Sequence, residues 1–392
     1  MYLYLSYSVS DEYLKAIIAQ ALQQAGHTVA ATPHGITSMA DHGAPLNQQV
    51  QSVVDADAVI VLLSPASVRD ENLEVDFEVA LREDIPIWPV VVSGQGLLEA
   101  YPLPRLLHPV GGAYCDLRVL PERVVEILSL FFIQMGSALN DNSLTELHWY
   151  DSAVAIQRDN PRAYHLRGTV YGARNEPEKA IADLSKAIDL NAYMPQAYAN
   201  RAREYRKSQQ YELALADCEA ALRLDSKHRM AYIIRGNVEI KLEQYAEAVR
   251  DFDAALAIDP QDALSYANRG HAKCLLGQMD AALADCNRAL AIDPQRWMAR
   301  LFRGEVYQTQ LEQKKRVEKS DPLLDLALAD FNAVLAIGHD NAAYYGRARV
   351  RFWKGDVPGA VVDCQKTLAL NPQHPAAERM RTFIEQHSQP HE

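Results

Sequence analysis

The sequence of 392 residues has few cysteines, no long apolar segment and no excess of basic residues. Its five cysteines form no CxxC pair and no His/Cys cluster at zinc spacing, so we expect a reduced, cytoplasmic protein without a metal site. No apolar run reaches the roughly 18 residues of a membrane span, and the first residues lack the basic segment of a signal peptide. The motifs GxSxG and HExxH and the Walker loop are also absent, so these common hydrolase and nucleotide-binding sites are not predicted.

The net charge of −12 is distributed unevenly along the chain. Residues 1–140 carry 6 Lys/Arg against 16 Asp/Glu, whereas the remainder carries 33 against 35. Neither part has the basic surface that binding to a phosphate backbone requires, so we expect no nucleic-acid partner. The length itself predicts more than one folded part, because a single core rarely grows to this size.

A repeated pattern occupies residues 161–374. Tyr-x-x-Arg-Gly and its variants recur at intervals of 34 residues, except for one interval of 44. The longer unit carries a polar insertion within Gln310–Leu326, which we expect to lengthen one helix before Pro322 breaks it. This insertion is either loop variation or a docking spur. The six units are 161–194, 195–228, 229–262, 263–296, 297–340 and 341–374.

Three positions of the unit keep one kind of residue, with the insertion left out of the count. Position 8 is always glycine or alanine, position 20 is always alanine, and position 24 is always leucine, phenylalanine or cysteine. Small residues let two helices approach closely, so each unit is predicted to be an antiparallel helix pair that stacks on the next. The pattern resembles the tetratricopeptide repeat (TPR) family, which implies an all-α solenoid. Residues 139–160 resemble a degenerate half-repeat that connects to it, and 375–392 a capping helix and tail.

Position 7 is arginine and position 23 is aspartate in every unit. The six pairs are Arg167/Asp183, Arg201/Asp217, Arg235/Asp251, Arg269/Asp285, Arg303/Asp330 and Arg347/Asp363. We predict an Arg–Asp ladder between the helices of one unit or of adjacent units. A structural role is favoured over anion binding, because each arginine has its own carboxylate.

Three of the cysteines, Cys218, Cys286 and Cys364, occupy position 24. We expect them to be buried, where cysteine acts as a small hydrophobic residue. A redox or metal role is not predicted for them.

In the TPR family the ligand lies in a groove lined by positions 2, 5, 9, 12 and 13 of the first helices. The resemblance therefore implies a protein or peptide partner bound by Arg203, Arg206, Lys207, Asn237, Lys241, His271, Tyr345, Arg349, Phe352 and Trp353. A cationic middle and an aromatic end suit an acidic or C-terminal segment. The family's Lys/Asn/Lys/Arg clamp for terminal carboxylates does not occur as a set. A solvated helix face is the alternative for the basic residues, and packing on the terminal helix is the alternative for Phe352 and Trp353.

The first 140 residues alternate strand and helix patterns. Strands are predicted at 2–6, 27–31, 56–63 and 85–92, and helices at 12–25, 46–54, 73–82 and 121–135. Continuous apolar strands that alternate with helices predict an α/β domain with a parallel sheet covered on both faces.

The same residues resemble a Toll/interleukin-1 receptor (TIR) domain of the prokaryotic kind. LYLSYSVSDEYLKAIIAQAL matches its first strand and helix, DADAVIVLLSPASVRDENLEVDFEVAL its third strand and third helix, and IPIWPVVV its fourth strand. The resemblance implies a flavodoxin-like fold over residues 1–138, with a long loop at 32–45.

Many TIR domains associate with other TIR domains, and some cleave NAD at the nicotinamide–ribose bond. The cleaving members carry Trp-x-x-x-Glu on the third helix, where this sequence has Asn72 and Asp76. Asp76 is thus the candidate catalytic residue, one methylene shorter than the family's glutamate, and small displacements cost rate. Tyr7 and Ser8 line the substrate pocket if it exists; otherwise they end the first strand. NAD is then a substrate, and no cofactor is implied.

Two functions from different classes remain. In the first, the repeats bind a partner and the TIR domain self-associates to transmit a signal. In the second, the repeats regulate a TIR enzyme that cleaves NAD as a defence effector. The first survives the departure at Asp76, whereas the second depends on it.

Overall fold

In the computed structural model the chain has two compact units, Met1–Asn200 and Arg201–Glu392. The described residues are 2–8, 12–24, 26–34, 51, 53–56, 58–63, 82, 87–91, 129–130, 132–133, 136–137, 141–338, 341–373, 379, 382 and 386. The long loop, Asp76, the helix predicted at 73–82 apart from residue 82, and most of the capping helix lie outside them.

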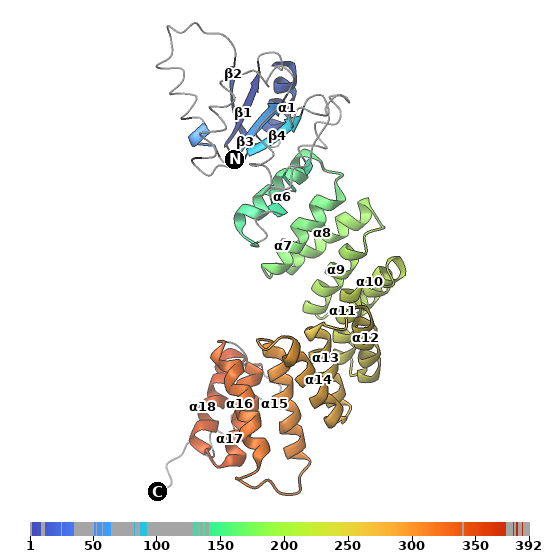
Figure 1. Ribbon diagram of the computed structural model, residues 1–392, viewed down its shortest axis with the longest axis vertical. Helices are drawn as coiled ribbons and strands as arrows, with labels where there is room; N and C mark the ends of the chain where they lie inside the picture. Colours follow the sequence, from blue (N-terminus) through green and yellow to red (C-terminus); the bar gives the residue numbers. More distant parts are fainter. Residues whose placement is uncertain are drawn as a thin grey trace. The chain divides into compact units, whose positions relative to one another are not determined.

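The first unit contains the predicted parallel sheet, which is confirmed. Its strands are β1 (Tyr2–Ser8), β2 (Thr28–His34), β3 (Ala58–Leu63) and β4 (Ile87–Val91). The described strands pair in the order β2-β1-β3-β4, all parallel, and α1 (Glu12–Gln24) connects the first two (Figure 1). Strand β2 lies on one side of β1, and β3 and β4 lie on the other, so the strand order switches between β1 and β3 as in flavodoxin-like sheets.

Strand β2 is longer than predicted. It extends through His34, three residues beyond Ala31, although Pro33 lies within it. A proline lacks the N–H that a central strand must donate, but β2 lies at the end of the strand order, with β1 as its neighbour. An edge position therefore tolerates Pro33, and the predicted loop begins later.

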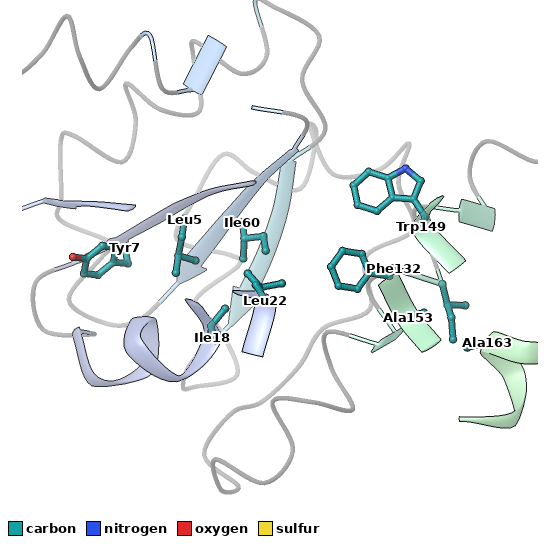
Figure 2. Packing of buried hydrophobic residues seen from close by; sticks show 10 residues of the cluster. Leu5, Tyr7, Ile18, Leu22, Ile60, Phe132, Trp149, Ala153 and Ala163 are labelled. Carbon is teal, nitrogen blue, oxygen red and sulfur yellow. The ribbon is translucent and has the colours of Figure 1, made fainter. Parts of the chain in front are cut away.

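The core of the sheet continues into the first helices of the repeat region. Leu5, Ile18 and Ile60 belong to one buried cluster with Trp149 of α6 (Leu144–Ile156) and Ala163 of α7 (Pro161–Ala173). Figure 2 shows the rings of Phe132 and Trp149 next to each other, on the same side of the strands. The ring centroid of Phe132 lies 5.1 Å from that of His27 and 5.7 Å from that of Trp149. The sheet and the first helices thus share one core.

The repeats fold as helix pairs. After α7 come α8 (Pro177–Leu190), α9 (Pro195–Lys207), α10 (Tyr211–Leu224), α11 (Arg229–Lys241), α12 (Tyr245–Ile258), α13 (Ala263–Leu275), α14 (Met279–Ile292), α15 (Trp297–Glu312), α16 (Pro322–Ala336), α17 (Asn341–Lys354) and α18 (Val357–Leu370). A residue with positive φ ends the first helix of five units, at Asn175, Gln209, Glu243, Gly277 and Gly355. The left-handed conformation turns the chain into the second helix.

The small residue at position 8 marks where the two helices of a unit approach. A Cβ on Gly236 would lie 2.9 Å from the ring of Phe252, which occupies position 24. A Cβ on Gly304 would likewise lie 2.9 Å from the ring of Phe331. These separations are closer than packed carbon atoms allow, which confirms the predicted reason for the small residue.

Gly236→Ala is expected to destabilise the protein by about 1–3 kcal/mol through overpacking against Phe252, partly offset by the better helix propensity of alanine, about 1 kcal/mol. Repeat two shows a combination that avoids the clash, because it has Ala202 at position 8 and the smaller Cys218 at position 24. The loss should therefore shrink in a Phe252→Cys background, as measured by urea denaturation. Equal losses in both backgrounds would show that the ring does not require the glycine.

The insertion packs on its own array. It lengthens α15 to 16 residues, compared with 13 in α13, and Pro322 begins α16, as predicted. Val317 packs against a core cluster of the last two repeats. A Cβ on Gly355 would lie 2.8 Å from the Nζ atom of Lys319. These contacts support packing within the array, and the docking spur stays a hypothesis.

Candidate partner-binding surface

The Arg–Asp ladder lies within the units, and its prediction is confirmed. In each pair the arginine Nε and Nη2 atoms donate to the two carboxylate oxygens of the aspartate, at 2.6–2.8 Å. The six aspartates are buried, and their bidentate pairing occupies Nε and Nη2 of each guanidinium, so that Nη1 can bind a further partner.

The remaining edge of several ladder arginines reaches the preceding helix pair. Nη1 of Arg167 donates to Asp151 at 2.9 Å, and Nη1 of Arg303 donates to Asn287 at 2.7 Å. Arg347 does the same with Asn332 at 2.7 Å. The ladder therefore joins both the helices of one unit and adjacent units, which supports its structural role.

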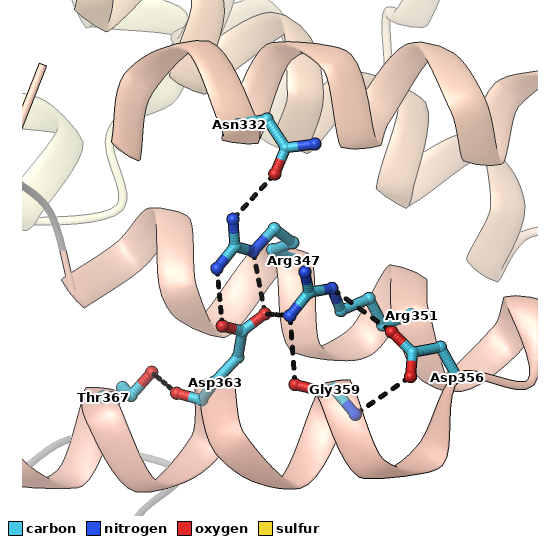
Figure 3. Close-up of polar contacts among 7 residues, drawn as sticks. All are labelled: Asn332, Arg347, Arg351, Asp356, Gly359, Asp363 and Thr367. Atoms are coloured by element: carbon cyan, nitrogen blue, oxygen red, sulfur yellow. Dashed lines mark hydrogen bonds and ion pairs between the residues drawn. The ribbon is translucent and has the colours of Figure 1, made fainter. Parts of the chain in front are cut away.

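In repeat six the ladder aspartate binds a second guanidinium group. The Asp363 carboxylate accepts both bonds from Arg347 and a further one from Nη1 of Arg351 at 2.9 Å (Figure 3). Its side chain is 1% exposed. Thr367 donates to the main-chain oxygen of Asp363, and Arg351 also donates to that of Gly359. Two guanidinium groups thus depend on one buried carboxylate.

The predicted basic residues of α9 surround a buried glutamate. Nε of Arg203 and Nζ of Lys207 donate to Oε1 of Glu204, at 3.3 and 3.0 Å. The Glu204 residue is 1% exposed, whereas the side chains of Arg203 and Lys207 are partly exposed. We call Arg203, Glu204, Arg206 and Lys207 the α9 cluster. It contains three cations and one carboxylate.

Arg206 is the least satisfied cation of the α9 cluster. Its Nε is buried and has no hydrogen-bond partner within the described part of the chain. Burial lowers the pKa of Arg206, Glu204 opposes that shift, and the nearby charge of Arg203 adds to it. Desolvation beside a like charge makes this guanidinium a favourable position for an added anion.

The next predicted residues continue on the first helices of repeats three and four. Lys241 is exposed and Asn237 is half-buried. The ring of His271 stacks on that of Phe302 with centroids 4.2 Å apart. Burial, followed by the charge of Lys241, lowers the pKa of His271 to about 4, so this ring is neutral at pH 7. His271 therefore offers packing and a neutral ring rather than a cation.

The aromatic end in repeat six is organised around Arg349. Its guanidinium lies 5.7 Å from the ring centroid of Tyr345 and 5.4 Å from that of Trp353. It also pairs with Glu312 at 2.8 Å. Trp353 packs against the core cluster of repeats five and six, whereas Phe352 is 42% exposed. Phe352 is thus the most accessible aromatic residue of the predicted set.

Tyr7 and Ser8, the candidate residues of the substrate pocket, both belong to β1. Ser8 is the last residue of β1, and Tyr7 is fully buried in the core cluster. Nζ of Lys15 lies 5.2 Å from the Tyr7 ring centroid. This burial favours the interpretation in which Tyr7 ends the first strand inside the core.

The position-24 cysteines are buried, as predicted. Burial raises the pKa of the thiols of Cys218 and Cys286 to about 12 and that of Cys364 to about 11. These thiols are protonated near neutral pH, and the nucleophilic form is the thiolate. Among the described residues, no three His, Cys, Asp or Glu side chains are grouped to hold a metal ion.

Two acidic residues of the site region were not anticipated from the sequence. Glu204 anchors the α9 cluster, and Glu239 of α11 is buried beside the ladder. The spacing of three residues between Glu204 and Lys207 is the signal that would have indicated the first pair. For Glu239, the signal is a negative charge at position 11, where repeats four and six have the cations Lys273 and Arg351.

Family models match both parts of the chain. The model described as a TIR domain matches residues 3–122. Models of tetratricopeptide repeats match residues 161–193, 195–228 and 263–296, and a further TPR model matches 236–277. The chain is a TIR–TPR fusion.

Solved structures agree on the TPR part. The crystal structure of a tetratricopeptide repeat protein from Parabacteroides merdae ATCC 43184 is 18% identical, with a TM-score of 0.51 over 67% of this chain and 100% of that one. The structure of the APC/C hetero-tetramer Cut9-Hcn1 is 14% identical, with a TM-score of 0.56 over 96% of this chain and 63% of that one. Both likenesses concern the fold alone. A comparison with curated proteins found no match.

Of the helices that the structure describes in the TIR–TPR chain, none combines the length and apolar character needed to cross a bilayer.

Proposed function

We propose that this TIR–TPR protein is a cytoplasmic signalling or assembly adaptor whose TPR array binds an acidic polypeptide segment at the α9 cluster. The TIR domain self-associates to pass the signal on. The α9 cluster carries the proposal, because three cations on one helix surround a single buried carboxylate, and Arg206 is desolvated. Carboxylates of a partner peptide would add the missing negative charge.

The ladder supports this assignment by elimination. The six arginines at position 7 of the first helices are bound to buried aspartates at 2.6–2.8 Å and fix the packing of the units. The α9 cations, at positions 9, 12 and 13, do not take part in this ladder. Lys241, exposed on the next first helix, and Asn237 extend the same surface into repeat three.

The proposal predicts that a fluorescent peptide of glutamate and glycine binds the full chain, and that a lysine–glycine peptide of equal length does not. Arg206→Glu combined with Lys207→Glu should weaken binding about tenfold or more, and added salt should weaken it further. Anisotropy titration measures both effects. Lys227→Glu combined with Arg250→Glu changes the net charge equally on exposed residues elsewhere and should leave affinity nearly unchanged. Equal losses in the two variants would overturn the proposed site.

The NAD-cleaving alternative rests on Asp76, which lies outside the described residues. Nicotinamide release from NAD, followed at high protein concentration with and without crowding, separates the two functions. Turnover that Asp76→Ala abolishes would replace the adaptor with the enzyme, and no turnover in any assembled state would end the alternative.

A further inference from the structure

Position 11 of the repeats faces the ladder aspartate at position 23. In the six units position 11 is Tyr171, Tyr205, Glu239, Lys273, Tyr307 and Arg351. Lys273 donates to Asp285 at 2.8 Å in repeat four, and Arg351 donates to Asp363 at 2.9 Å in repeat six. Repeat three places Glu239 where those repeats place a cation, so a carboxyl group faces the carboxylate of Asp251.

Glu239 is buried in this setting. The residue is 9% exposed, and its Oε2 atom has no hydrogen-bond partner within the described part of the chain. The carboxylate of Asp251 is already engaged with Arg235 through Nε and Nη2 at 2.7 Å. The guanidinium of Arg235 is therefore committed to Asp251 by two hydrogen bonds, and it donates none of them to Glu239.

The surrounding charges do not compensate for a second negative charge. Asp251, Glu247 and Arg250 face Glu239 from α12, Arg235 lies on its own helix, and the neutral thiol of Cys218 faces it from α10. Burial, followed by the charge of Asp251, raises the pKa of Glu239 to about 7. Arg235 opposes this shift and Glu247 adds to it. Arg250 is drawn toward Glu247, with which it pairs at 2.8 Å.

We propose that Glu239 and Asp251 form a proton-binding site in repeat three, which makes the local stability of the TPR array depend on pH near neutrality. A proton is the occupant that the geometry admits, because Oε2 is enclosed and protonation of Glu239 removes its charge repulsion with the Asp251 carboxylate. Protonated Glu239 keeps the helix pair α11–α12 closed. Ionised Glu239 favours its opening.

The direction of the effect follows from the raised pKa. In the open form Glu239 titrates near its ordinary pKa of 4.5, and in the closed form near 7. The closed form binds the proton more tightly. The stability that the closed form gains from this proton is fully present below pH 4.5 and is lost as the pH rises through about 7. Between about pH 6 and pH 8, opening of α11–α12 should increase about tenfold from this group alone.

Hydrogen exchange with mass spectrometry on the full chain tests the site. The exchange rate of α11–α12 peptides in the wild type is divided by that in Glu239→Gln at each pH, which cancels the intrinsic pH dependence of exchange. The ratio should rise about tenfold from about pH 6 to pH 8. It should stay flat for α13–α14 peptides, where Lys273 holds the same position. A ratio for α11–α12 that does not change with pH would overturn the proposal.

Two further measurements keep the test independent of variant folding. A carbon-13 titration of the Glu239 carboxyl in the wild-type chain should have its midpoint near 7, and a midpoint near 4.5 would contradict the site. Glu247→Gln, a substitution of the neighbouring exposed carboxylate on α12, serves as the matched control. It should preserve the pH dependence of α11–α12 exchange, whereas loss of that dependence would assign the proton to Glu247.

Discussion

Asp363→Ala is expected to destabilise the last repeat by about 3–5 kcal/mol, because it leaves the guanidinium groups of Arg347 and Arg351 without their buried carboxylate. The array is a chain of coupled units rather than a two-state domain, so the loss is best read locally. Hydrogen exchange of α17 and α18 measures it. Asp356→Ala removes an exposed carboxylate that lies 3.5 Å from Arg351 and caps α18 by accepting from the Gly359 N–H, so it should cost about 1 kcal/mol, clearly less than Asp363→Ala.

The ladder also predicts strong coupling between its members. Arg347→Leu combined with Asp363→Leu should be less destabilising than the sum of the two single changes, since neither member of the pair is left buried without the other. Arg351 loses Asp363 in the single and in the double variant alike, so its contribution cancels in the cycle. The same cycle applies to Arg235 and Asp251, where Arg235→Leu alone should cost more than the double replacement. Additive losses in both cycles would mean that these hydrogen-bonded pairs contribute no interaction energy.

Trp149→Ala is expected to destabilise the TIR sheet as well as α6, by about 3–5 kcal/mol. Trp149 is 4% exposed and packs with Phe132 in a cluster that includes Leu5 of β1 and Ile60 of β3. Removing the indole leaves a cavity in the core that the sheet and α6 share. Exchange protection of β1 and β3 measures the effect.

Leu144→Ala is the matched control for this prediction. Leu144 lies on the same helix but is 69% exposed, so its truncation should leave the protection of β1 and β3 unchanged. Unchanged protection of these strands in Trp149→Ala would instead mean that the TIR core is complete without the first helix of the repeat region.

The repeat architecture was predictable because the same residue types recur at the same positions in all six units. A glycine such as Gly236 and a ring such as Phe252 occur in a fixed relation, so the period alone indicates which side chains meet. The shared core around Trp149 was not predictable in this way. It depends on contacts between residues of unrelated patterns, and no repetition indicates that Phe132 lies against the first helix.

The turn at position 15 shows a second limit of the sequence. Positive φ occurs at Gly277 and Gly355, where it is expected, and also at Gln209 and Glu243, where the residue type does not indicate it. Local preference is overridden there by the packing of the helices on either side, at a cost of about 1 kcal/mol or more per residue.

The candidate site was predicted in part. The cations of α9 follow from the register of the family, but the burial of Glu204 beneath them does not. His271 was predicted as a groove-lining residue, and the structure adds that its ring stacks on Phe302 and is uncharged at pH 7. Burial of this kind is set by the neighbouring unit, so one unit's sequence does not reveal it.

The most direct test of the account compares two charge-altering variants in one peptide titration. Recognition is proposed for the α9 cluster, and an architectural role for the ladder. Arg206→Glu with Lys207→Glu should lose affinity for the glutamate–glycine peptide at temperatures where it stays folded. Some loss of stability is expected as well, because Lys207 no longer pairs with the buried carboxylate of Glu204. Arg235→Leu with Asp251→Leu should keep affinity at temperatures where it stays folded, and its measured change should be in stability. Loss of affinity confined to the ladder variant, with full binding by the α9 variant, would contradict the account.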